Sequence, residues 1–237
     1  MHTRSRYHWL PRNFLSGPVE TLDVGFGNGA LCYAAYKKGN KVLGIDYLKE
    51  QTQRTALFFR SFINSDNLRF QFLNAYELPK LNHCFDQIIC SETLEHISND
   101  RLIISYMYDL LKPGGILHLC CPNALHPHNN LGRRNYPEDG EHVRDGYTME
   151  SYASLLEPEG FKIVDSLGLG SPGLVRYDKI VRSIRNRFGL FAALPVFLLV
   201  LPFAMFCDKP VTKNPFSIYV KAVKISKNSA ILGGGVK

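Results

Sequence analysis

Short apolar runs alternate along this chain with longer segments in which apolar residues recur at helical spacing. The apolar runs predict seven strands, at residues 19–25, 41–46, 68–75, 85–92, 115–122, 161–168 and 216–225. The intervening segments predict helices at residues 30–39 and 48–62, from Asn99 or Asp100 to just before Pro113, and from Thr148 onward. Strands that alternate with helices in this way are typical of an open, doubly wound α/β sheet with mostly parallel strands.

A long apolar run interrupts this alternation near the carboxyl end. Residues 188–207 are 20 residues without a charged side chain, and residues 176–187 just before them carry five cations and one acid. The run has about the length that a transmembrane helix needs. However, Pro195 and Pro202 interrupt it, and a true crossing would leave the last strand on the far side of the membrane. We therefore expect a hydrophobic helical insertion before the last strand, and its role stays open between peripheral contact with an anionic membrane, a lid and a homodimer face.

The length and composition indicate one globular domain over residues 1–237. Within it we expect a cofactor-binding core at 19–168, the basic and apolar insertion at 176–207 and the last strand at 216–225. The chain is 45% hydrophobic and 21% charged, which excludes a disordered chain, a collagen and a disulfide scaffold. Its net charge of +7 favours an anionic partner, but no alternation of basic and aromatic residues indicates nucleic acid.

Cysteine usage and the amino terminus bear on the compartment. None of the six cysteines forms a C-x-x-C pair, and most lie in apolar runs, where a thiol is usually a small buried hydrophobe. The amino terminus is basic and has no continuous apolar stretch of the kind that a secretory signal requires. We therefore predict a cytoplasmic protein, with peripheral membrane contact as an open alternative.

The turn after the first predicted strand reads LDVGFGNG and carries Gly25, Gly27 and Gly29. Glycines at such a turn let a ligand touch the backbone, and the amides at the following helix start attract a carboxylate or a phosphate. Asp46, 17 residues after Gly29, ends the second strand, where a carboxylate can accept hydrogen bonds from both hydroxyls of a ribose. This pattern predicts a nucleoside cofactor, and taken alone it also fits a dinucleotide.

Further motifs narrow the choice. Asp23 before the glycines, Asp46, FDQIICSETLEHI at residues 85–97 and LKPGGILHL at residues 111–119 together resemble the class I S-adenosylmethionine-dependent methyltransferases. The resemblance covers about residues 19–168 and, weakly, the last strand. It implies a Rossmann-like sheet of seven strands whose last strand is antiparallel and lies beside the fifth, and it implies S-adenosyl-L-methionine as the cofactor.

The resemblance also implies roles for individual residues. Gly25, Gly27 and Gly29 would line the methionine portion of the cofactor, and Asp23 would orient its ammonium group. Asp46 would hold the ribose hydroxyls. The remaining positions are Asn74 and Ala75 near the adenine, and Ser91 and Glu92 beside the sulfonium. The third strand often ends in aspartate in this family, and here the residue is Asn74, whose amide can still bond the adenine edge.

Candidate catalytic residues follow the fourth strand. Glu92, Glu95 and His96 would share one helix face if a helix began at Glu92. Three further histidines, His126, His128 and His142, lie in the loop beyond the fifth strand, together with Glu141.

Three interpretations of these residues stay open. In the first, His96 or His142 is a general base that Glu95 orients. In the second, Glu92, Glu95, His96 and His142 bind a divalent metal, similar to the small-RNA terminal 2′-O-methyltransferases. We do not favour the metal, because a second histidine near His142, which those enzymes have, is not obvious here. In the third, these side chains only pack or face solvent.

The function that these features predict is S-adenosylmethionine-dependent methyl transfer to an oxygen, or less readily a nitrogen or carbon, of a small or lipid-like acceptor. An RNA methyltransferase, a dehydrogenase that uses a nicotinamide dinucleotide and a non-catalytic, methyltransferase-like membrane adaptor are the alternatives.

Overall fold

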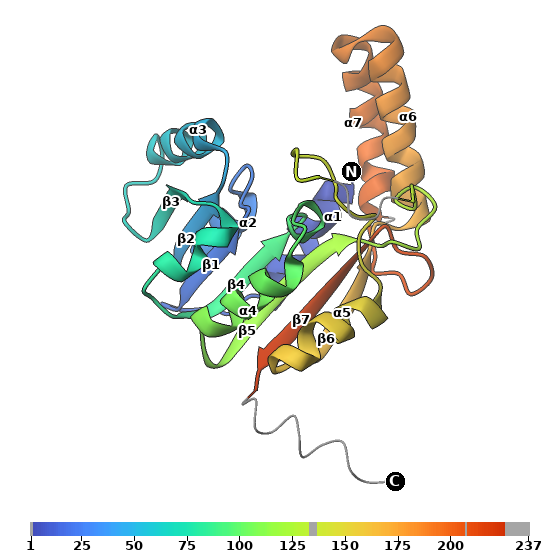
Figure 1. Cartoon of the computed structure of the whole chain (residues 1–237). Coiled ribbons are helices and arrows are strands. Elements are labelled where there is room, and N and C mark those ends of the chain that lie inside the picture. Colours follow the sequence, from blue (N-terminus) through green and yellow to red (C-terminus); the bar gives the residue numbers. More distant parts are fainter. Residues whose placement is uncertain (1, 133–136, 207, 226–237) are drawn as a thin grey trace, which may run out of the picture.

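The computed structural model describes residues 2–132, 137–206 and 208–225, and its centre is one twisted sheet (Figure 1). The sheet has seven strands in the order β3-β2-β1-β4-β5-β7-β6. Their bounds are β1 Glu20–Val24, β2 Lys41–Asp46, β3 Leu68–Phe72, β4 Phe85–Ser91, β5 Leu111–Pro122, β6 Phe161–Leu169 and β7 Ser217–Lys224. Only β7 runs antiparallel to its neighbours, β5 and β6. This is the predicted Rossmann-like methyltransferase topology, with the last strand beside the fifth.

Two hydrophobic cores hold helices against the two faces of the sheet. The flanking helices are α1 His2–Trp9, α2 Ala30–Lys37, α3 Lys49–Arg60, α4 Asp100–Leu110 and α5 Met149–Leu156. Apolar side chains of α4 and α5 pack on one face, in the larger core. Leu10 and Phe14, which follow α1, pack with α2 and α3 on the other face. The alternation of strands and helices along the sequence thus becomes three layers.

Several boundaries differ from the sequence prediction. β3 ends at Phe72 rather than at residue 75, because Asn74 caps a 3₁₀ helix, Ala75–Lys80, by accepting a hydrogen bond from the Tyr76 amide. β5 begins at Leu111 rather than at residue 115, since Leu111 already pairs with Phe85. The amino-terminal helix α1 was not predicted.

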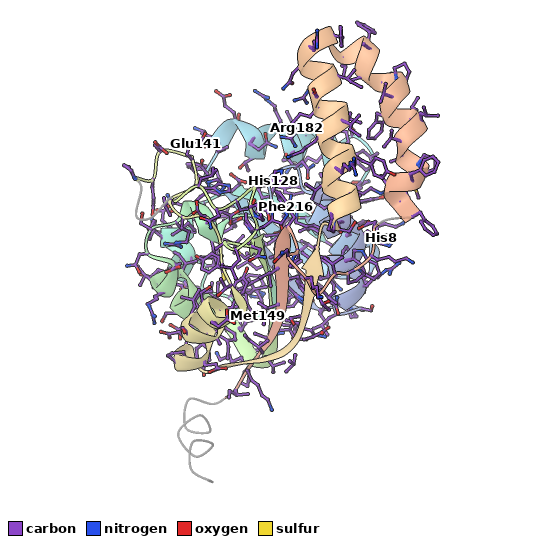
Figure 2. The ribbon with its side chains drawn as sticks, turned by 90° about the vertical axis from the view of Figure 1, so that its right-hand side faces the viewer. His8, His128, Glu141, Met149, Arg182 and Phe216 are labelled. Atoms are coloured by element: carbon purple, nitrogen blue, oxygen red, sulfur yellow. The ribbon has the colours of Figure 1, made fainter. Side chains whose placement is uncertain are left out.

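The predicted insertion is a helical hairpin between β6 and β7. It consists of α6, Pro172–Phe188, and α7, Leu190–Phe206, joined at Gly189 with φ of 83°. The hairpin stands away from the sheet, and its side chains point outward along much of its length (Figure 2). Among the described residues, no helix combines the length and the hydropathy that a membrane crossing needs. Cys207, the last residue of the predicted insertion, lies outside the described residues.

Strand direction places the hairpin relative to the glycine turn. β6 is parallel to β5, because each is antiparallel to β7. The end of β6, from which α6 begins, therefore lies at the same edge of the sheet as the ends of β1 and β4. In sheets of this kind, ligands bind at that edge.

Candidate active site

The three glycines after β1 all adopt positive φ, but they leave different kinds of space. The φ angles are 74° at Gly25, 56° at Gly27 and 75° at Gly29. A Cβ atom at Gly25 would meet the side chain of Thr93, and one at Gly29 would meet that of Phe59. A Cβ atom at Gly27 would meet no atom within 4 Å. Gly25 and Gly29 therefore permit the turn to pack, whereas Gly27 presents bare backbone to an open space.

Gly27 lines a cavity of about 320 Å³ at the ends of the first four strands. Its walls include four of the predicted cofactor residues beyond the glycines, which are Asp46, Asn74, Ala75 and Glu92. Asp46 is only 7% exposed, and its two carboxylate oxygens accept hydrogen bonds from the amides of Gly27 at 3.1 Å and Leu48 at 3.0 Å. Each oxygen keeps a further lone pair, so the carboxylate is held in place and can still bind a ribose hydroxyl.

A second cavity, of about 180 Å³, adjoins the other side of the glycine turn. It is bordered by Asp23, Ser91 and Glu92. Burial raises the pKa of Asp23 to about 7, although the Cys32 thiol donates a hydrogen bond to its carboxylate at 3.0 Å. A buried carboxyl group of this kind suits a cationic partner, because a nearby positive charge lowers its pKa and favours its ionised form. An ammonium group fits this requirement.

Helix α1 forms part of the wall of this second cavity. The sequence analysis predicted neither the helix nor its place at the site. Arg6 and Tyr7 of α1 are part of the cavity lining. The Arg6 guanidinium forms an ion pair with Glu92 at 2.5 Å, and the Tyr7 hydroxyl donates to the Asn28 side chain at 3.2 Å. The basic sequence of residues 2–12 was the available signal, but basic composition alone does not indicate which carboxylate a cation meets.

Glu92 does not join the candidate catalytic residues in the predicted way. No helix begins there. Glu92 has a φ of 55°, and only Leu94–His96 form a short 3₁₀ helix. The carboxylate instead binds Arg6 and accepts a hydrogen bond from Ser217 at 3.3 Å. The expectation of one helix face with Glu95 and His96 is therefore wrong, because the left-handed backbone at Glu92 turns its side chain toward α1.

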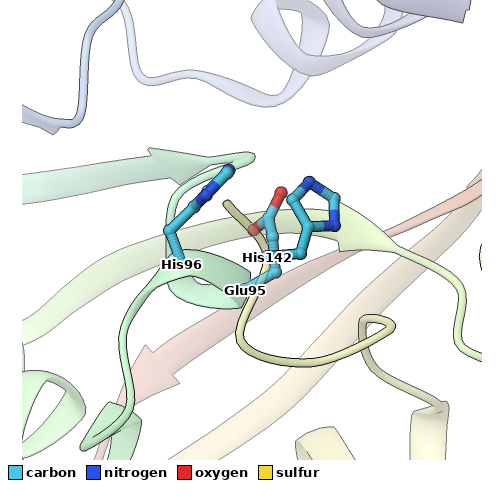
Figure 3. A group of neighbouring side chains, drawn as sticks. All are labelled: Glu95, His96 and His142. Atoms are coloured by element: carbon cyan, nitrogen blue, oxygen red, sulfur yellow. The ribbon is translucent and has the colours of Figure 1, made fainter. Parts of the chain in front are cut away.

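Glu95, His96 and His142 do come together. One ligand atom from each lies within 4.8 Å of those of the others. The two imidazole rings pack edge to face with centroids 4.6 Å apart, and Figure 3 shows the Glu95 carboxylate between them. His96 also lines the larger cavity. His126 and His128 pair with each other elsewhere in the loop and are not part of this cluster, and neither is Glu141.

The Glu95 side chain is the most unusual member of the cluster. It is fully buried, and among the described residues neither carboxylate oxygen has a hydrogen-bond partner. Burial raises its pKa, and contacts with its own backbone amide, the positive charges of His96 and Arg6, and a contact with the Cys121 thiol oppose that rise. A buried carboxyl group without partners is costly unless a cation or a proton compensates it. The arrangement can therefore stabilise an imidazolium ion, or bind a divalent cation with the two imidazoles.

Arg144 and Val143 bring His142 to this position. The Val143 amide donates a hydrogen bond to the carbonyl of Glu95 at 2.9 Å. The Arg144 guanidinium donates to the Leu94 carbonyl at 3.1 Å and to Asp100 at 2.7 Å. These bonds fasten the loop beyond β5 to the 3₁₀ turn that carries Glu95. They connect residues far apart in the sequence, so the local pattern could not have indicated them.

The strand order and the glycine turn together define the Rossmann-like methyltransferase fold, and comparisons with known proteins give the family. A family model described as a methyltransferase domain matches residues 16–162. A mitochondrial ubiquinone biosynthesis O-methyltransferase of Rattus norvegicus is 31% identical over 169 residues, which are 67% of this chain and 48% of that protein. A ubiquinone biosynthesis O-methyltransferase of Psychrobacter arcticus is 33% identical over 134 residues, 50% of this chain and 52% of that one.

The solved structures agree on the fold. Magnesium protoporphyrin IX methyltransferase of Synechocystis, with bound SAH, matches with a TM-score of 0.58 at 16% identity, covering 94% of this chain and 83% of that one. The chain spans about half the length of the curated relatives it matches. It belongs to the class I S-adenosylmethionine-dependent methyltransferases. The bare backbone at Gly27 beside the Asp46 carboxylate fits S-adenosyl-L-methionine, the cofactor of this family.

Proposed function

We propose that this protein is an enzyme that transfers a methyl group from S-adenosyl-L-methionine to an oxygen atom of a small, lipid-like acceptor. The observation that carries this proposal is the position of His96, which lines the cofactor cavity and lies beside the buried carboxylate of Glu95. A hydroxyl acceptor needs such a proton acceptor, because it must lose its proton as it is methylated. The curated relatives support an oxygen acceptor, since they are O-methyltransferases of ubiquinone biosynthesis, and ubiquinone is a lipid.

In this proposal the two cavities hold the two ends of the cofactor. Asp46 bonds the ribose hydroxyls, and Asn74 and Ala75 border the adenine. The bare backbone of the glycine turn accommodates the methionine portion. Asp23 faces the ammonium group, with Ser91 and Glu92 near the sulfonium. Arg6, which already pairs with Glu92, is the cation available for the carboxylate of the methionine portion.

Each residue of the cluster then has its own role in deprotonating the acceptor hydroxyl. Bound S-adenosylmethionine supplies a methyl group on a positively charged sulfur, and this methyl is ready for in-line displacement. His96 would take the proton of the acceptor hydroxyl at an imidazole nitrogen, so that the acceptor oxygen could receive the methyl group. The Glu95 carboxylate stabilises the imidazolium ion that forms. His142, which packs against His96 and is partly exposed, receives the proton from His96 and passes it to solvent.

A metal-assisted version of the same reaction uses the same three side chains. One carboxylate and two imidazoles are ligands that zinc, manganese and related ions accept. The fourth ligand that the family resemblance suggests, Glu92, is bound to Arg6 and Ser217 instead. We therefore propose the general base, and chelation tests the alternative.

The acceptor class is tested with labelled cofactor and three related compounds. These are a catechol with a short isoprenoid tail, the same catechol without the tail, and an aniline with the same tail. We expect label on an oxygen of the tailed catechol, at a higher kcat/KM than for the untailed one. Transfer to nitrogen or carbon alone, or transfer to an RNA oligomer in place of the catechols, would contradict the proposal.

A further inference from the structure

Helix α7 presents an apolar surface that the other described residues leave exposed over most of its area. Its 17 residues include no charged side chain. Phe191 is 93% exposed, Phe206 77% and Leu199 73%. Only Ala193 and Ala204, which are small, are buried among the described residues of the helix. A helix that is apolar on all sides is normally enclosed by protein or by lipid, so this hairpin is missing the surface that covers it.

The neighbouring helix supplies positive charge. α6 carries five exposed cations, which are Arg176, Lys179, Arg182, Arg185 and Arg187. Arg185 and Arg187 lie close to the turn at Gly189, where Phe188 and Leu190 are 64% and 67% exposed. Exposed aromatic and aliphatic side chains therefore occur at the tip of the hairpin together with cations. Anionic head groups and the acyl boundary below them match this combination.

We propose that the α6–α7 hairpin docks this enzyme on an anionic phospholipid bilayer, an inference that rests on the lipid-like acceptor of the proposed function. A second copy of the chain fits less well, because a symmetric contact through the hairpin would bring two sets of five cations together. A membrane crossing fits less well too. The 17 residues of α7 reach only about 25 Å at 1.5 Å per residue, against a hydrocarbon core of about 30 Å.

The hairpin is joined to the cofactor cavities at its base. Asp208, just after α7, is buried and accepts a hydrogen bond from Ser5 of α1 at 2.5 Å. The next residue of α1, Arg6, lines the second cavity and pairs with Glu92. Because the hairpin leaves the sheet at the edge where the cavities lie, docking of its tip brings that edge toward the bilayer. An acceptor dissolved in the membrane then reaches the site without crossing open water.

Binding to vesicles tests this inference without any catalytic step. The full chain is sedimented with vesicles of phosphatidylcholine alone and with vesicles that contain about one third phosphatidylglycerol. One variant removes apolar tip residues, Leu190→Ser with Phe191→Ser, and another removes tip charges, Arg185→Gln with Arg187→Gln. Matched controls make the same kinds of change at exposed positions on α3, Leu57→Ser with Phe58→Ser, and Arg54→Gln with Arg60→Gln.

We expect the full chain to bind the anionic vesicles at least about tenfold more strongly than the neutral ones, since each basic residue near the surface adds to the attraction. Each tip variant should lose about tenfold or more of that binding, while the α3 controls keep it. Every variant should retain its melting temperature and its affinity for S-adenosylmethionine, which shows that it is folded.

Three results would overturn the inference: no binding to anionic vesicles, equal binding to both kinds of vesicle, or tip variants that bind as well as the parent. Sedimentation without lipid is the further check, because a dimer that the tip variants convert to a monomer would make the hairpin a face between copies. A chain that binds vesicles but methylates no hydroxylated lipid would contradict the proposed function alone. One that methylates the tailed catechol in solution but ignores vesicles would contradict the docking alone.

Discussion

The imidazole of His96 packs edge to face against that of His142, with ring centroids 4.6 Å apart, although the two histidines come from different loops. The contact exists because the Val143 amide bonds the Glu95 carbonyl and so fastens the second loop to the first. Only His96 of the pair lines the larger cavity. In the proposed reaction, this difference gives the two histidines separable roles.

Replacement of His96 by alanine should lower kcat by a factor of about 10² to 10⁴, the usual contribution of a general base, and leave cofactor affinity unchanged. His142→Ala should have a smaller effect. The measurement is steady-state kinetics together with calorimetric titration of S-adenosylmethionine. His83→Ala is the control, because His83 is exposed and pairs with Glu20 away from the cavity.

Removal of divalent cations should leave activity unchanged if His96 acts as a base. The assay compares enzyme dialysed against a chelator with the same enzyme after addition of zinc, manganese or magnesium. A loss of activity that one of these ions restores would favour the metal-bound form of the cluster of Glu95, His96 and His142. In that case Glu95→Gln should also weaken binding of the ion itself.

Replacement of Gly27 by leucine should weaken binding of S-adenosylmethionine by about 10- to 100-fold, because the side chain would occupy the open space beside the turn. The protein should still fold, since no neighbouring atom blocks that space. Gly114→Leu is a matched control. Gly114 has a φ of 75° and open space around it, but it lies at the opposite end of β5. Equal affinities for the two variants would remove Gly27 from the cofactor site.

Replacement of Arg6 by glutamine should weaken cofactor binding by about tenfold, through loss of a charged hydrogen bond to the carboxylate of the methionine portion. It should also leave Glu92 without its cation. Arg12→Gln is the control, since Arg12 stacks on the Trp9 ring rather than lining a cavity. Unchanged affinity in Arg6→Gln would restrict α1 to a structural role.

The raised pKa of Asp23 gives a pH dependence with a defined sign. Between about pH 4 and pH 7 the folded protein binds a proton at Asp23 that the unfolded chain has released, because burial raises the pKa from 3.8 to about 7. Asp23 therefore lowers the stability of the cofactor-free protein as pH rises through this range. The whole shift corresponds to at most about 4 kcal/mol.

Asp23→Asn removes this proton-linked effect. The free energy of unfolding of the variant minus that of the parent should increase from pH 4 to pH 7, and chemical denaturation measures it. Buried His118, whose pKa burial lowers to about 3, acts with the opposite sign but cancels in the difference. The same variant should bind S-adenosylmethionine more weakly at pH 8. A pH-independent difference would mean that Asp23 titrates normally.

Much of this fold was predictable because the strands of a parallel sheet are apolar and the helices between them are periodic. The glycine turn and Asp46 were predictable for a similar reason, since both lie beside a strand end that the sequence marks clearly. Helix α1 escaped prediction because its stability depends on contacts with distant residues, such as the ion pair of Arg6 with Glu92. The left-handed backbone at Glu92 also escaped prediction, because glutamate has no local preference for that conformation.

The position of β7 between β5 and β6 affects the order in which the chain can fold during synthesis. β6 and the hairpin leave the ribosome before β7, yet β6 has no neighbour in the sheet until β7 arrives. The hydrophobic hairpin is thus available to a lipid surface while the sheet still lacks β7 and β6. If translation takes place close to a membrane, the α6–α7 hairpin can bind lipid before the sheet is complete. If it takes place far from a membrane, the exposed apolar hairpin would need to bind chaperones.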